Sequence, residues 1–245
     1  MKRIILAFCA IICCAGYTAA ADTALATFNQ ANTAFEKGQY TEAAAMYESL
    51  AGRHGGNAAL YFNLGNTYFR QQQMGKALLN YERAKRLAPR DRDVLYNLEF
   101  VRQQVKEPQQ PFAVALLSAL NGLATLNEVA ALCSFCFIGF LLGATAWIFY
   151  RQRFILPTLA AFMLFILATG WLFLKINVEV WTDEGIVTAG PAEVRNGPGT
   201  ENSVGFSLPE GRKVVVLGEN NDWVAVGLSS EGLRGWIEKK YIEKI

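Results

Sequence analysis

The residues that most often do chemistry in proteins are scarce in this sequence and lie apart from one another. The single histidine, His54, lies in a glycine-rich turn, where we expect an exposed loop residue. The five cysteines all lie in apolar runs, at Cys9, Cys13, Cys14, Cys133 and Cys136. A zinc cluster, a Ser-His-Asp triad or a Cys-His pair needs several such side chains at one place. We therefore predict no enzyme activity, no metal site and no cofactor.

Two other motifs carry polar groups at suggestive spacing, and both have a simpler explanation. The segment Asn196–Thr200 (NGPGT) is glycine-rich like a phosphate-binding loop, but it lacks the Lys and Ser/Thr that follow in that motif. Its glycines fit tight-turn geometry instead. Glu219 and Asp222 are neighbouring carboxylates in a turn-like run, where solvation accounts for them. The formal net charge of +2 gives no basis for nucleic-acid binding.

The composition indicates membrane segments in the middle of the chain. Hydrophobic residues make up 52% of the sequence and charged residues 18%, which is apolar for a soluble protein. Residues 129–150 and 154–174 contain no charged residue, and their lengths of 22 and 21 residues suffice to cross a hydrocarbon core about 30 Å thick. We predict two transmembrane helices here; a buried helical pair of a soluble protein is the alternative.

The turn between the two apolar runs predicts their orientation. Only residues 151–153, Arg-Gln-Arg, separate the runs, so the helices form a hairpin. Arginines avoid the bilayer core and are enriched in cytoplasmic loops, so we expect this turn on the cytoplasmic side. Cys133 and Cys136 lie three residues apart on one helix face. A redox pair inside the bilayer is one interpretation, but small polarisable residues at a helix contact are favoured.

The beginning of the chain predicts a signal peptide over residues 1–21. Lys2 and Arg3 precede an apolar run, which leads to a cleavage site of the small-x-small type, and we expect cleavage before Ala21 or Asp22. An uncleaved anchor is the main alternative. Together with the hairpin, export leaves both ends of the mature chain outside. We therefore predict a protein of the bacterial inner (cytoplasmic) membrane with both soluble domains on the periplasmic side.

A 34-residue repeat precedes the apolar block. Asn32 and Asn66 each begin an Asn-Thr pair and lie 34 residues apart, and Phe35 matches Phe69 at the same offset. A period of 34 residues is typical of tetratricopeptide helix pairs, and the second unit, YFNLGNTYFRQQQMGKALLNYERAKRLAP, resembles that family. The predicted all-α domain covers residues 22–107, with repeats at about 24–57 and 58–91 and a capping helix at 92–105.

The resemblance to tetratricopeptide repeats implies a groove that binds extended peptides, lined by the first helix of each repeat. The predicted groove residues are Phe28, Asn32, Phe35, Phe62, Asn66, Phe69 and Arg70. Phe28 and Asp93 stand where the carboxylate-binding version of this groove has basic residues, so recognition of a free C-terminus is not expected. An alternative for Asn32 and Asn66 is that they satisfy polar groups between the helices.

A short linker joins the repeats to the first predicted transmembrane helix. Two prolines in the segment 106–111 (KEPQQP) end the helical domain, since proline denies continued helix. Residues 111–127 are apolar but too short for a span and are broken by Gly122. We predict an interfacial helix in the linker 108–128.

Residues 178–245 predict a small all-β barrel. Strands are expected at 187–194, 213–217, 223–226 and 235–237, punctuated by turn-forming residues. The segments EVRNGPGT, VVVLG, DWVAV and GWI, in this order, resemble the bacterial SH3 family. Trp223, Trp236 and Tyr241 are the candidate ligand surface, and they serve equally well as core and rim of so small a barrel.

The order of parts is similar to the BatE-type proteins of the Bat (aerotolerance operon) family: signal peptide, two tetratricopeptide units, hairpin and bacterial SH3 domain. That resemblance implies a multidomain membrane scaffold for protein–protein interaction, with membrane partners that carry von Willebrand A domains and a role in envelope or oxygen-stress tolerance. The alternative function is a tether or sensor of the cell wall, in which the SH3-like domain binds peptidoglycan.

Overall fold

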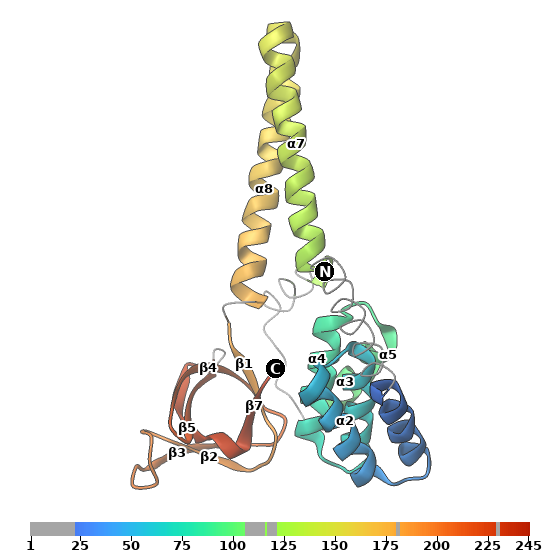
Figure 1. Ribbon diagram of the computed structural model, residues 1–245. Coiled ribbons are helices and arrows are strands. Elements are labelled where there is room, and N and C mark those ends of the chain that lie inside the picture. The colour runs from blue at the N-terminus through green and yellow to red at the C-terminus, as the bar shows by residue number, and fades with distance from the viewer. Residues whose placement is uncertain (1–22, 106–115, 117–121, 180–181, 229–230) are drawn as a thin grey trace, which may run out of the picture. The chain divides into compact units, whose positions relative to one another are not determined.

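The computed structural model describes residues 23–105, 116, 122–179, 182–228 and 231–245, which form two compact units (Figure 1). One unit contains the helical repeat and the β-domain, and the other contains the apolar helices. The predicted signal peptide at 1–21 and most of the linker 108–128 lie outside the described residues.

The helical repeat is a run of antiparallel helix pairs. After a helix at residues 23–36 come α2 (Tyr40–His54), α3 (Ala58–Arg70), α4 (Met74–Leu87) and α5 (Arg92–Gln104). Side-chain caps start two of these helices: the Asn57 Oδ1 accepts from Leu60 N, and the Asp91 carboxylate accepts from Asp93 N and Val94 N. The helix expected at 92–105 is therefore present as α5, and it packs against α4.

Small residues let the helices approach closely. Ala43 and Ala77, at equivalent repeat positions, are fully buried, and so is Ala31, whose equivalent in the second repeat is Gly65. A Cβ atom added to Gly65 would lie 2.8 Å from the Tyr81 ring, so only glycine fits against this aromatic side chain. The same ring is 1% exposed, and it fills the space that these small residues leave.

The second unit is a hairpin of two long apolar helices, α7 (Leu126–Tyr150) and α8 (Ile155–Glu179), joined by the short 3-10 helix η1 (Arg151–Phe154). Both helices are long and apolar enough to cross a membrane, with a mean hydropathy of 2.1. Each extends beyond the run predicted from the sequence, because the flanking polar residues continue the helix. Most of their apolar side chains are exposed; Phe135 and Leu156 are 73% and 76% exposed. A contiguous exposed apolar surface of this kind is not that of a buried helical pair.

The contact between the two apolar helices uses aromatic and small side chains. Phe137 lies 5.2 Å from Phe165, between ring centroids. A Cβ atom on Gly143 would lie 3.1 Å from the Thr158 hydroxyl, so the helices are close there. The Cys133 sulfur lies 3.4 Å from the Thr169 hydroxyl, which supports the helix-contact interpretation of that cysteine.

The β-domain is a seven-stranded antiparallel sheet with the order β3-β2-β6-β5-β4-β1-β7. The strands are β1 (Glu184–Val187), β2 (Ala192–Arg195), β3 (Val204–Leu208), β4 (Lys213–Asn220), β5 (Trp223–Leu228), β6 (Leu233–Glu238) and β7 (Ile242–Lys244). Buried side chains of alternate residues form its own core, which includes Val194, Val224 and Ile237.

The prediction of one strand over 187–194 was wrong. The chain leaves β1 at Val187 and turns at Gly190–Pro191 before β2 begins. Proline has no N–H to donate to a ladder, and a Cβ on Gly190 would lie 2.6 Å from the backbone N of Glu210. Strands β3 and β7 were not predicted, because β3 is mostly exposed and β7 has three residues, so neither carries a clear alternation of buried and exposed residues.

The β-domain packs directly on the helical repeat, within the same compact unit. Ile186 of β1 is fully buried, and it belongs to the core cluster of the helices rather than to that of the sheet. Gly75 N donates to the Glu210 carboxylate at 2.7 Å. A Cβ on Gly75 would lie 2.5 Å from the Val187 carbonyl oxygen. The sequence predicted two modules, at residues 22–107 and 178–245, and these contacts join them in one compact unit.

Candidate functional site

The predicted groove residues fall on two helices. Phe28, Asn32 and Phe35 lie on the helix at 23–36, and Phe62, Asn66, Phe69 and Arg70 lie on α3. The aromatic and amide side chains are half-buried, and Arg70 is exposed. Residues of the two helices correspond at an interval of 34, so the phenylalanines and the asparagine recur once along this face, whereas the counterpart of Arg70 is Glu36.

Asn32 lies at the centre of a hydrogen-bonded trio. Its Oδ1 accepts from the Tyr47 hydroxyl at 2.5 Å and from Asn63 Nδ2 at 3.0 Å. Tyr47 is 1% exposed, and burial raises the pKa of its hydroxyl. The protonated form is the one that can donate to Asn32, so the trio joins three helices through neutral groups.

The same trio recurs one repeat later. The Asn66 Oδ1 accepts from the Tyr81 hydroxyl at 2.6 Å and from Asn97 Nδ2 at 2.9 Å. Burial likewise raises the pKa of Tyr81 above its ordinary value. We call the two trios together the asparagine ladder: Asn32, Tyr47 and Asn63, then Asn66, Tyr81 and Asn97. Its second trio ties α5 to the repeat, so α5 takes the place of the first helix of a further repeat.

In each groove asparagine, the ladder uses the side-chain oxygen and leaves the side-chain nitrogen available. Both Oδ1 atoms are occupied inside the domain, in agreement with the alternative that these asparagines satisfy groups between helices. No hydrogen bond joins the Nδ2 of Asn32 or Asn66 to another residue that the structure describes. Those two amide groups are donors that an extended peptide backbone can use.

Aromatic rings line the same face beside the ladder. Phe28 packs edge-on against Tyr47 with ring centroids 5.8 Å apart, and Phe62 meets Tyr81 at 6.0 Å. Phe69 contacts Phe100 of α5, also at 5.8 Å. These ring pairs hold the phenylalanines in fixed positions, so the face is an apolar surface with regularly placed amide donors.

Arg70 has a more exposed role at the end of α3. Its guanidinium lies over the Tyr40 ring, 5.1 Å from the centroid. Tyr40 in turn packs edge-on against Phe35 at 5.4 Å between centroids. The cation is therefore held next to one predicted groove phenylalanine, where an acidic side chain of a ligand can reach it.

Sequence reasoning missed the ladder partners, although a signal for them was present. Asn29, Asn63 and Asn97 follow one another at intervals of 34 residues, as the two groove asparagines do. Polar residues that recur at the repeat period on adjacent helix faces are candidates for mutual hydrogen bonds.

The structure brings together two of the three aromatic residues proposed for the β-domain surface. Trp223 of β5 pairs with Glu238, and Trp236 of β6 pairs with Ala225, so the two indoles are diagonal neighbours. Val224 and Ile237, which alternate with them, point into the core, so both tryptophans lie on the outer face and are half-buried. Tyr241, in η2 (Lys239–Tyr241), instead packs against the core cluster of the sheet.

Comparison with known families identifies both soluble domains. A family model for the tetratricopeptide repeat matches residues 28–92, and one for the bacterial SH3 domain matches residues 190–243. No curated protein in the comparison matches the chain. Domains of these two kinds are typically non-catalytic and mediate interactions. The chain therefore contains a tetratricopeptide repeat domain and a bacterial SH3 domain, separated by two helices that are apolar and long enough to cross a membrane.

Proposed function

We propose that the protein is a non-catalytic scaffold anchored in the bacterial cytoplasmic membrane, with both interaction domains in the periplasm. The groove of the repeat domain binds an extended segment of another membrane protein. The order of the modules suggests a Bat-type complex, in which that partner carries a von Willebrand A domain. The scaffold then serves envelope integrity or oxygen-stress tolerance.

One observation carries the anchored arrangement. Segments on either side of the apolar hairpin pack together in one compact unit, through Ile186 and the bond from Gly75 N to Glu210. Such contacts cannot form across a bilayer. They therefore support a hairpin that enters and leaves the membrane on the same face. The arginines at positions 151 and 153 favour a cytoplasmic turn, which leaves the packed domains outside.

Cysteine labelling tests this orientation. In a chain whose native cysteines are replaced by alanine, Ser49→Cys reports on the repeat domain, Ser207→Cys on the SH3 domain and Gln152→Cys on the turn. Both serines are exposed. We expect a membrane-impermeant maleimide to label the two domain positions in spheroplasts and the turn only after lysis. Labelling of the turn in intact spheroplasts, or of only one domain, contradicts the proposal.

A substitution that removes the side-chain nitrogen of a groove asparagine but keeps its oxygen tests the groove. Asn66→Asp keeps an oxygen that accepts from Tyr81 and Asn97 but removes the available Nδ2 donor. With Asn32→Asp in the same chain, we expect cross-linking in native membranes followed by mass spectrometry to lose the partner proteins. The thermal stability of the repeat domain should change little. Unchanged partner recovery would argue against the groove.

A cell-wall tether is the second candidate function, and the outward tryptophans favour it. Half-buried indoles on an outer sheet face are a suitable platform for a peptide or glycan. If this function is correct, full-length protein in detergent pellets with purified peptidoglycan, and Trp223→Ala with Trp236→Ala abolishes pelleting. Leu233→Ala, an exposed position on the same sheet, is the matched control. If the full-length protein does not pellet with peptidoglycan, the tether function is rejected and the adaptor function remains.

A further inference from the structure

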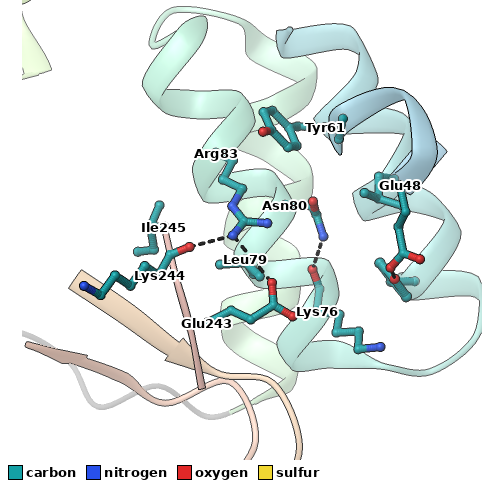
Figure 2. A pocket seen from close by; sticks show the side chains of 12 residues that line it. Glu48, Tyr61, Lys76, Leu79, Asn80, Arg83, Glu243, Lys244 and Ile245 are labelled. Atoms are coloured by element: carbon teal, nitrogen blue, oxygen red, sulfur yellow. Dashed lines mark hydrogen bonds and ion pairs between the residues drawn. The ribbon is translucent and has the colours of Figure 1, made fainter. Parts of the chain in front are cut away.

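A pocket of about 530 Å³ lies on the helical repeat, beside Glu243, Lys244 and Ile245 (Figure 2). Side chains of α2, α3 and α4 form most of it, and residues 243–245 of the SH3 domain close one side. None of the seven predicted groove residues lines it. Its volume lies within the range of about 300–1,000 Å³ that is usual for ligand sites.

The floor of the pocket is apolar and rigid. Leu64 and Leu79 are 3% and 1% exposed and belong to the helical core, and Ala51 packs against that core. The Tyr61 and Tyr68 rings form further walls. These surfaces are able to take up an aliphatic side chain.

A buried side-chain amide in the wall of this pocket has an oxygen to which no other described residue donates a hydrogen bond. Asn80 is 2% exposed, and its Nδ2 donates to the Lys76 carbonyl oxygen at 2.8 Å. That bond determines the orientation of the amide, because a carbonyl oxygen only accepts. The Oδ1 at the other end meets no donor among the residues that the structure describes (Figure 2). A buried acceptor without a donor is costly, so an N–H group that reaches it gains a favourable bond.

The charges around the pocket leave one cation available. The Arg83 guanidinium donates to the Lys244 carbonyl oxygen at 2.6 Å and lies 3.5 Å from the Glu243 carboxylate. The Glu48 carboxylate accepts from the Tyr68 hydroxyl. The Lys76 ammonium lies 4.9 Å from the Tyr68 ring centroid and forms no ion pair with any described residue. A ligand carboxylate can pair with it.

We infer that this pocket binds an acidic peptide segment of a partner protein, at a site separate from the groove. An aliphatic side chain of the peptide packs on Leu64 and Leu79, and a backbone N–H donates to the Asn80 Oδ1. An adjacent Glu or Asp side chain pairs with the Lys76 ammonium. Because the SH3 domain supplies one wall, the site exists only while the two domains are packed together.

Methyl NMR of the full-length protein in detergent tests the inference with defined probes. The first peptide is acetyl-Leu-Glu-Leu-amide, and its Gln analogue removes the acidic side chain. A third, acetyl-Leu-Gln-Leu with a free C-terminus, asks whether a terminal carboxylate substitutes for it. We expect saturable shifts of the Leu64 and Leu79 methyl signals with the Glu peptide and at least tenfold weaker binding of the other two.

Two variants separate ligand binding from structure. Lys76→Gln should weaken binding of the Glu peptide about tenfold, whereas Lys37→Gln, an exposed lysine outside this pocket, should not. Asn80→Leu should weaken binding and raise the Tm, because it removes a buried acceptor without a donor. Shifts that survive both pocket variants, shifts confined to the groove, or no shift at all would each overturn the proposal. In the last case the pocket holds water alone.

Discussion

Ile186→Ala should destabilise the helical repeat, although Ile186 belongs to a strand of the SH3 domain. The side chain is fully buried in the helical core. The substitution removes three carbon atoms, worth about 2.4 kcal/mol at about 0.8 kcal/mol for each buried CH2 group. The remaining cavity adds to this, so we expect a loss of about 3 kcal/mol, within the usual range for such truncations.

Hydrogen exchange of the full-length protein in nanodiscs measures which elements lose stability in Ile186→Ala. About 3 kcal/mol corresponds to about a hundredfold faster exchange through local opening. We expect this acceleration in α4 as well as in β1. Ile237→Ala is the matched control, since Ile237 is equally buried but lies in the core of the sheet itself. If Ile186→Ala accelerates exchange only in the strands, the two domains do not share a core and the reasoning fails.

Three further predictions concern single sites. Burial alone would raise the pKa of Glu82. The opposing effect of nearby cations, among them Lys213 of the SH3 domain, is larger, so the pKa of Glu82 lies below its ordinary value. Its stabilising contribution is therefore present at neutral pH and lost as the pH falls through the folded-state pKa. In urea unfolding below pH 5, the free energy of unfolding should fall less steeply with decreasing pH in Glu82→Gln than in the wild-type protein. Equal slopes in the two proteins would contradict this. Because burial raises the pKa of Tyr81, the contribution of this residue to folding stability should persist below pH 10 and be lost above it. Absorbance titration of Tyr81→Phe should show one fewer tyrosine that ionises above pH 10. Gly143→Leu should push α7 from α8 at Thr158 and lower the Tm of the detergent-solubilised protein relative to Gly139→Leu, a position with open space.

Local pattern accounts for what could be predicted correctly. The 34-residue period, the two charge-free runs and the turn-rich β segment each repeat or persist over short stretches of chain. Helix pairs, apolar helices and antiparallel strands follow from such periodicity alone. Errors arose where that signal is weak: at Gly190–Pro191, which divides an apparently continuous strand, and in β3, whose side chains are mostly exposed.

The candidate site was predictable only in part. The sequence alone identified Asn32 and Asn66 as polar groups on a repeated helix face, because their spacing equals the repeat period. It could not assign their oxygens to the ladder, since Tyr47 and Tyr81 approach from other helices.

The kind and order of the parts can be inferred from local sequence pattern: a helical repeat, an apolar hairpin and a small β-domain. Each of these follows from interactions between residues near one another in the chain. The packing of the first and last parts into one compact unit, in which Ile186 lies in the helical core and Gly75 N donates to Glu210, follows only from the tertiary fold. Gly75 and Glu210 are 135 residues apart, and a single buried contact at such separation leaves no period in the sequence. Shape and burial decide it, and they exist only once the chain has folded.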